Sequence, residues 1–234
     1  MKRITFYRIV IIFICLTPDL SAKSTSKIWL TEKLSYKLSP EWTLKSEFSQ
    51  RFDNRNTAEG LPSGGAIDEW EELFAEFGVD YALSSKWVFN GSYRYIQAKK
   101  NTPRYTTENR FFVASEYKFK IGTLNAGLRT RVISRLFPDS MSERWKYRVT
   151  VTFSFSLPTP LEINKNPILF TFYDELHLDL RSRPFNTNEM KIGFKFIINR
   201  ILDFDLYYAS EIKPPVAGVK NFTNICGIEM GLRF

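Results

Sequence analysis

The 234-residue sequence has few of the side chains that bind metals, form cross-links or carry out nucleophilic catalysis. It contains two cysteines and one histidine. Cys15 lies in an amino-terminal segment that we expect to be removed, so Cys226 is left without a partner for an internal disulfide. One histidine among scattered carboxylates has no metal-ligand spacing, and no glycine-rich phosphate loop or dinucleotide fingerprint is present. We therefore expect no metal, cofactor or disulfide.

Long apolar runs are also missing. The longest covers residues 9–16, far short of the roughly 20 residues of a membrane-spanning helix. It follows three basic residues and precedes a small-residue cleavage site at 20–22, the pattern of a secretory signal peptide. The basic residues are Lys2, Arg3 and Arg8. We expect residues 1–22 to be a cleaved signal and residues 23–234 to form one domain.

The charge balance indicates the kind of partner. The formal net charge is +8, of which the signal carries +2, so the mature chain carries +6. A basic chain can bind nucleic acid, but an exported protein rarely meets it, and we expect none. Lipopolysaccharide phosphates of the outer-membrane lipid, or anionic solutes, are more suitable partners.

The last ten residues indicate the location. Apolar side chains alternate with small or charged ones from Ile225 to Phe234. A strand of this kind, ending on an aromatic carboxyl terminus, resembles the closing strand of the β-barrels of Gram-negative outer membranes. In those proteins the barrel-insertion machinery recognises this strand. We therefore expect that machinery as a partner and Phe234 as the insertion signal.

The same period of two recurs along the whole mature chain, which is the signature of a transmembrane barrel. A soluble β-sandwich also alternates, but its strands usually have about 5 to 6 residues, and most segments here are longer. Only helices and closed barrels satisfy every backbone group in lipid, and no helix pattern is evident. The eleven alternating segments are 28–38, 42–52, 69–83, 87–96, 110–119, 124–133, 145–157, 168–180, 190–198, 202–210 and 225–234.

The predicted fold is all-β: an antiparallel transmembrane β-barrel of ten to twelve strands, with short periplasmic turns and long extracellular loops. Segments 38–42 and 83–87 look like the same tight turn used twice, each ending on a Trp of an interfacial aromatic belt. Eleven segments conflict with the even strand numbers of bacterial barrels. Either 28–38 pairs irregularly or plugs the lumen, leaving ten strands, or a strand near 158–167 completes twelve. The predicted long loops are 53–68, 97–108, 134–143, 181–188 and 212–224.

Charged residues on the polar faces form the candidate lumen cluster. One interpretation is a selectivity ring in which fixed positive charge favours anions. The other is a lumen closed by interlocked arginine–carboxylate pairs, which a barrel of this size favours because it encloses little space. The cluster consists of Arg51, Arg94, Arg129, Arg131, Arg144, Arg148, Glu72, Glu76, Asp80 and Glu116.

His177 is the candidate for catalysis. It lies on a polar face beside Glu175 and Asp179, and two serines, Ser154 and Ser156, lie on the preceding strand. Ser, His and a carboxylate would suit a barrel-embedded lipid hydrolase or deacylase. Such enzymes open their site toward the lipid, whereas this alternation points His177 inward. We therefore do not expect an enzyme.

The order of several short motifs resembles the DUF2490 family of predicted outer-membrane proteins of unknown function. The resemblance implies an outer-membrane barrel and assigns no reaction or ligand. Three functions remain open: a structural barrel or narrow pore for small, anionic solutes; the hydrolase built around His177; and a surface-interaction protein acting through loops 53–68 and 212–224. The motifs are Trp29, 50–52, 93–95, 128–131, 144–148, 172–175 and 231–234.

Overall fold

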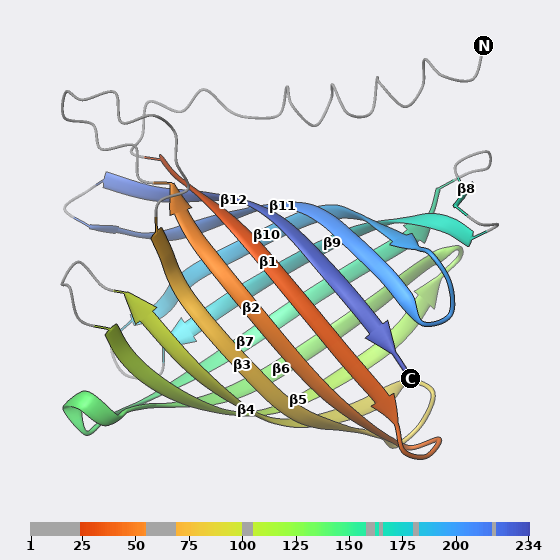
Figure 1. Ribbon diagram of the computed structural model, residues 1–234, viewed down its shortest axis with the longest axis horizontal. Helices are drawn as coiled ribbons and strands as arrows, with labels where there is room; N and C mark the ends of the chain where they lie inside the picture. The colour runs from red at the N-terminus through yellow and green to blue at the C-terminus, as the bar shows by residue number, and fades with distance from the viewer. Residues whose placement is uncertain are drawn as a thin grey trace, which may run out of the picture.

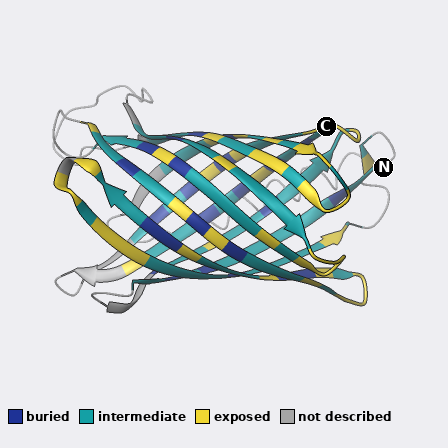
Figure 2. Cartoon of the chain, turned by 90° about the horizontal axis from the view of Figure 1, so that it is seen from below, coloured by how far each residue is buried: buried dark blue, intermediate teal, exposed yellow. Residues whose placement is uncertain are grey.

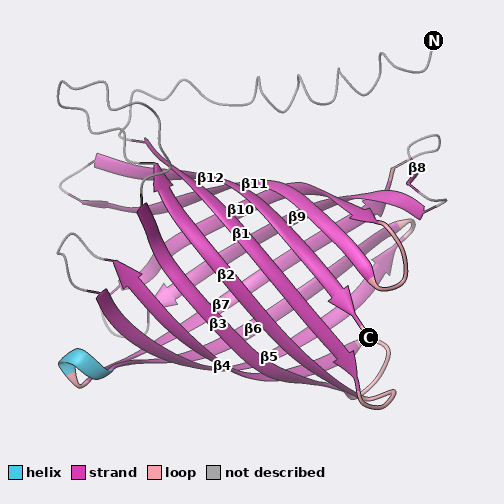
Figure 3. Ribbon diagram, viewed as in Figure 1, coloured by secondary structure: helices cyan, strands magenta, loops and turns pink. Residues whose placement is uncertain are grey.

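The computed structural model describes residues 24–54, 69–99, 105–157, 162–163, 166–179, 183–216 and 219–234. The expected signal peptide lies outside these residues. The described chain is all-β, with one short 3₁₀ turn, Pro138–Ser140, at one end (Figure 3). The strands are β1 (Ser24–Lys37), β2 (Trp42–Asn54), β3 (Glu69–Ala82), β4 (Trp87–Lys99), β5 (Tyr105–Ile121), β6 (Leu124–Phe137), β7 (Ser142–Ser156), β8 (Glu162–Ile163), β9 (Asn166–Asp179), β10 (Arg183–Ile197), β11 (Leu202–Val216) and β12 (Val219–Arg233).

Eleven of these strands close into a barrel (Figure 1). Neighbours along the chain pair antiparallel from β1 to β7, β7 pairs with β9, and the meander continues to β12. The two-residue β8 pairs only with the start of β9, so the described residues of the segment near 158–167 add no further barrel strand. All eleven alternating segments predicted from the sequence correspond to barrel strands.

The barrel closes through a parallel pair, β1 with β12, in which Ile28 lies opposite Cys226 and Leu34 opposite Leu232. With an odd number of strands in a meander, the first and last run in the same direction, so a parallel seam is the only closure. The ladder continues past β12, because Phe234 N donates to Ser35 O (2.8 Å) and Lys37 N donates to Phe234 O (2.9 Å). Segment 28–38 is therefore a full wall strand, and the expectation of an even number was wrong.

The two ends of the barrel differ. We call the end with connections 38–41, 83–86, 122–123 and 198–201 the tight-turn end, and the opposite end the loop end. The two turns ending on Trp42 and Trp87 are built alike. Ser39 Oγ accepts from Trp42 N (3.1 Å), and Ser84 Oγ accepts from Trp87 N (3.1 Å). Asn199 Oδ1 accepts from Leu202 N (2.8 Å) in a third copy of this turn.

At the loop end the strands run further than the sequence pattern suggested. β5 begins at Tyr105 and β7 at Ser142, inside segments that were expected to be loops. Alternation of hydropathy marks a strand only where one face is apolar, whereas backbone pairing needs no apolar face. The strands therefore continue beyond the point where their sequence pattern fades.

Alternation sorts the side chains into an outer and an inner face (Figure 2). On the outer face Val113 is 69% exposed and Phe77 62%, whereas the inward Phe74 is 2% exposed. Trp42 packs on Tyr81 and Trp87 on Tyr117, with ring centroids 4.7 and 4.8 Å apart near the tight-turn end. Large apolar side chains thus cover the outside, and the core of the molecule is the lumen.

Two acidic side chains, Glu32 and Asp174, also lie on the outer face, opposite Phe48 and Met190 respectively.

Within the described segments, no helix has the length and apolar character needed to cross a membrane.

Candidate functional site in the lumen

The inner wall of the barrel carries a layer of alternating aromatic and arginine side chains, which we call the central girdle. It starts on β1, where the ring of Trp29 lies 3.8 Å from the guanidinium carbon of Arg51 on β2. The same carbon lies 5.2 Å from the ring of Phe74 on β3. Arg51 also pairs with Glu72 at 2.9 Å, so this arginine is held on two sides by rings and by a carboxylate.

The girdle continues through the next three strands. The guanidinium carbon of Arg94 on β4 lies 3.8 Å from the Phe74 ring and 5.4 Å from the ring of Phe112 on β5. Arg131 on β6 approaches Phe112 from the other side, at 5.3 Å. Six consecutive strands thus contribute Trp29, Arg51, Phe74, Arg94, Phe112 and Arg131 in one chain of cation–π contacts.

Tyr207 on β11 continues the girdle on the other side of the seam. Its ring lies 3.6 Å from Lys191 Nζ on β10 and fills the space beside Gly227 on β12, where a Cβ atom would overlap it. Tyr207, Ala209 and Ile225 form a buried apolar cluster, against which Trp29 packs. The layer that begins at Trp29 therefore returns to Trp29 across the seam.

Between these two halves lies a buried polar cluster around Glu175 on β9, which is 2% exposed. Its carboxylate accepts from Arg148 Nη1 (2.7 Å) and Thr150 Oγ1 (2.8 Å) and lies 2.7 Å from His177 Nε2. Because the neighbouring side chains occupy the carboxylate, it functions as an internal counter-ion for Arg148.

The register excludes the catalytic triad suggested by the sequence. His177 lies opposite Arg148, whereas Ser154 lies opposite Thr171. Six residues of strand separate Thr171 from His177, roughly 20 Å at 3.3 Å per residue. Neither Ser154 nor Ser156, which is further still, can be activated by His177. His177 is a buried structural side chain, 7% exposed.

On the loop side of the girdle, charges of opposite sign are again matched. Glu108 accepts from Arg110 Nε (2.6 Å) and Arg110 Nη2 (3.1 Å), and it also pairs with Arg135. Arg144 lies with its guanidinium carbon 5.6 Å from the Phe137 ring. The inward Ile96 and Ile133 are buried in this part of the lumen, whereas Arg144 is exposed at the loop end.

On the tight-turn side, a cavity of about 250 Å³ remains, which we call the turn-side cavity. Seven cationic and four acidic side chains line it. They are Lys33, Lys45, Arg94, Arg129, Arg131, Lys195, Arg233, Glu47, Glu76, Asp203 and Glu229. The wall is therefore strongly polar, with an excess of positive charge.

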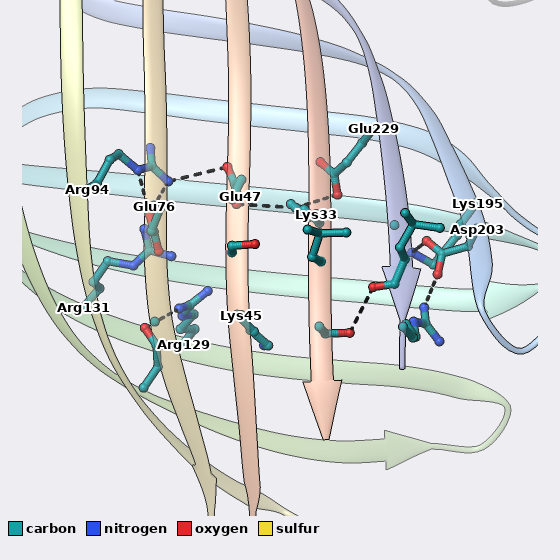
Figure 4. A pocket seen from close by; sticks show the side chains of 18 residues that line it. Lys33, Lys45, Glu47, Glu76, Arg94, Arg129, Arg131, Lys195, Asp203 and Glu229 are labelled. Atoms are coloured by element: carbon teal, nitrogen blue, oxygen red, sulfur yellow. Dashed lines mark hydrogen bonds and ion pairs between the residues drawn. The ribbon is translucent and has the colours of Figure 1, made fainter. Parts of the chain in front are cut away.

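Five of these eleven charges form one chain of ion pairs (Figure 4). Arg94 Nη2 lies 2.5 Å from Glu76 and 3.6 Å from Glu47. Lys33 Nζ lies 4.0 Å from Glu47 and, across the parallel seam, 2.5 Å from Glu229. Figure 4 also shows Lys195 joined to Asp203, at 2.6 Å. The pairs join β1, β2, β3, β4 and β12 into one electrostatic belt.

Two arginines of the cavity stand apart from this belt. Arg129 Nη2 donates to the amide oxygen of Asn90 (3.3 Å). Arg131 has a buried Nε without a hydrogen-bond partner. Among the described residues, neither guanidinium has a carboxylate within the 4.0 Å of an ion pair, so neither arginine belongs to the belt.

The structure places all ten residues of the candidate cluster on the inner face but does not gather them in one site. Arg51 and Glu72 lie in the girdle layer, and Arg94, Glu76, Arg129 and Arg131 line the turn-side cavity. Asp80 pairs with Lys45, and Glu116 Oε1 lies 3.9 Å from Lys118 near the tight-turn end. Arg148 lies with Glu175, and Arg144 lies at the loop end. Phe234 ends the seam at the tight-turn end, its side chain 62% exposed.

Sequence reasoning missed the inward aromatic residues Trp29, Phe74, Phe112 and Tyr207. Each occupies a position on the polar face of its strand, so an aromatic residue in the wrong phase of the alternation was the available signal. The described residues contain no group of three or more His, Cys, Asp or Glu side chains that could hold a metal ion.

Comparison with known proteins gives a family and a distant structural match. Residues 26–221 match the family described as "Protein of unknown function (DUF2490)". No curated protein sequence matches. Among solved structures, LpxR from Salmonella typhimurium is similar at 12% identity and a TM-score of 0.46, over 81% of this chain and 83% of that one. A likeness this distant has no bearing on the function of the present chain.

Proposed function

The chain belongs to the DUF2490 family, and from this premise we propose that it is a barrel of the bacterial outer membrane whose lumen does not conduct. In this proposal the girdle closes the barrel at mid-height and leaves the turn-side cavity open on one side only. The observation that carries it is the continuity of the girdle from Tyr207 across the seam to Trp29 and on through Arg131.

The outer face supports the membrane location. Its strands have 13 to 17 residues, enough for the 9–11 residues of a tilted transmembrane strand. Soluble monomers rarely expose so continuous an apolar surface, and Trp–Tyr pairs near one end suit an interfacial belt. Short turns face the periplasm in such barrels, so the turn-side cavity would face the periplasm and the loop end the exterior.

A gated, narrow anion passage is the second candidate. It is favoured by the seven cations and four carboxylates of the turn-side cavity, which would act as an anion-selective vestibule if the girdle opened. The hydrolase is disfavoured, because the register separates His177 from Ser154. The surface-interaction hypothesis concerns 53–68, of which 55–68 lie outside the described residues, and 212–224, which apart from 217–218 belongs to β11 and β12 and is not a long loop.

Two measurements test the proposal. Density-gradient fractionation of exporting cells should place the protein in the outer-membrane fraction; recovery with soluble periplasmic proteins would contradict the location. Proteoliposomes containing the mature chain should then swell no faster than protein-free liposomes in small anionic or neutral solutes. Rapid swelling that depends on the sign of the solute's charge would favour the passage instead.

A further inference from the structure

The turn-side cavity has an imbalance of charge that points to a ligand. Each of its four carboxylates is already paired: Glu76 and Glu47 with Arg94, Asp203 with Lys195, and Glu229 with Lys33. Lys45 is paired with Asp80 just beyond the cavity wall. The guanidinium groups of Arg129 and Arg131 are left over.

These two arginines are adjacent inward positions on β6, two residues and therefore about 7 Å apart. Both lean from β6 toward β4 and β5, Arg129 to Asn90 and Arg131 to Phe112. The residue opposite Arg131 is Arg148, which is itself committed to Glu175. Figure 4 shows Arg129 and Arg131 on the same side of the cavity as Arg94 and Glu76.

Arg129 and Arg131 carry two energetic costs in this arrangement. A buried donor without an acceptor retains the cost of its lost hydration, and Arg131 Nε is such a donor. Two neighbouring like charges add repulsion. An acceptor group that carries negative charge and enters from the cavity would remove both costs.

We propose that the turn-side cavity binds the phosphate group of a phosphate monoester, clamped between Arg129 and Arg131. A dianion neutralises two guanidinium groups, and the planar fork of arginine matches phosphate oxygens. Asn90, which already accepts from Arg129, positions one side of the clamp. The cavity volume of about 250 Å³ admits a phosphate with a small organic group. A soluble phosphate ester and the head group of a lipid such as phosphatidic acid share this chemistry.

The proposal goes beyond the closed lumen and requires only the cavity and its two arginines, so it can fail while the lumen is still found closed. The test uses the whole mature chain refolded in a zwitterionic detergent. Calorimetric titration with glycerol 3-phosphate probes the soluble source, and the same titration with a short-chain phosphatidic acid, with a short-chain phosphatidylcholine as the control, probes the lipid source.

Arg131→Gln should weaken binding by about ten- to a hundredfold, the range expected for a lost charged hydrogen bond, and Arg129→Gln should do the same. Arg144→Gln removes one charge at the loop end and should leave the affinity unchanged. Heat-dependent electrophoretic mobility confirms that each variant is folded.

Loss of glycerol 3-phosphate binding in either variant, with Arg144→Gln unchanged, supports a soluble ligand. The same pattern with the short-chain phosphatidic acid alone supports a lipid head group. Failure of the wild-type chain to bind both probes would overturn the proposal. Equal binding by wild type, Arg129→Gln and Arg131→Gln would overturn it as well.

Discussion

Arg51 and Trp29 face each other across the first two strands, with the guanidinium carbon of the arginine 3.8 Å from the centroid of the indole ring. The arginine is not free to act as a mobile pore charge, because a second ring and the carboxylate of Glu72 hold it. Although Arg51 is a charged residue on the lumen wall, its role here is to stabilise the structure. The contact between Arg51 and Trp29 is the first contact of the girdle, which closes the lumen in our proposal.

The parallel seam predicts a specific cross-link. Ile28 lies opposite the native thiol Cys226 on the outer face, and neighbouring strands lie about 4.8 Å apart, within the Cα separation that a disulfide spans. In a Cys15→Ser background, Ile28→Cys should form an intramolecular disulfide on mild oxidation of the folded barrel. The cross-link is measured as a mobility shift after denaturation without reductant.

Glu32→Cys supplies the control for the seam. It lies on the same outer face of β1, four residues or roughly 13 Å further along the strand, so it should remain uncross-linked. Efficient cross-linking from Glu32→Cys, or none from Ile28→Cys, would show that β1 and β12 do not pair in this register.

Gly227 and Tyr207 predict a packing effect. A Cβ at Gly227 would overlap the Tyr207 ring, so Gly227→Ala must displace that ring from the girdle. We expect a loss of about 1–3 kcal/mol in the free energy of unfolding, the usual cost of overpacking. Urea unfolding of the barrel in lipid vesicles measures it.

Gly91→Ala is the matched control, because a Cβ there meets nothing within 4 Å. It should change stability little. Adding Tyr207→Leu to Gly227→Ala should recover part of the loss, since the smaller side chain vacates the space. Equal stability of Gly227→Ala and Gly91→Ala would contradict the packing of Tyr207 against β12.

Glu175 predicts a large electrostatic effect. Glu175→Gln leaves Arg148 buried without its counter-ion, and breaking a buried ion pair on one side costs about 3–5 kcal/mol. Glu116→Gln, whose only described partner is Lys118 at 3.9 Å, should cost well under about 1 kcal/mol. If urea unfolding shows the two variants to be equally stable, the cluster around Glu175 is not the internal support described.

We expect a substitution of Phe234 to impair membrane insertion without changing the stability of the folded barrel. Its side chain is largely exposed, whereas its backbone bonds to β1 survive substitution. Phe234→Ser should therefore unfold at nearly the same urea concentration after refolding, yet accumulate less in the outer membrane of exporting cells. Normal accumulation in the membrane would remove Phe234 as the insertion signal.

The sequence was sufficient to predict the barrel, because alternation depends only on which face each residue occupies. It could not predict the parallel seam, since a period of two specifies faces and leaves the partner strand of β1 open. The even-number rule then misled the strand count. At the loop end the strands were predicted too short, because backbone hydrogen bonds continue beyond the residues whose hydropathy alternates.

The candidate lumen cluster could also be predicted only in part from the sequence. Alternation puts Arg94 and Arg131 on the inner face, but it does not distinguish the arginine that forms ion pairs from the one that forms none with a described carboxylate. That difference arises from strand register and shear, which bring Glu76 to Arg94 and no described carboxylate to Arg131. The aromatic half of the girdle was missed because alternation alone does not show that Phe74 and Phe112, which lie on the polar faces of their strands, contact cations there.

Single-channel recording of the mature chain in a planar bilayer tests the closed lumen most directly. Wild-type barrels that are inserted and folded should show no discrete conductance steps. Trp29→Ala combined with Phe74→Ala removes two rings of the girdle and should open the lumen, whereas the outward pair Phe77→Ala and Trp87→Ala should leave it silent. Reproducible, anion-selective steps from the wild-type protein would contradict the account and make the inward arginines a selectivity filter.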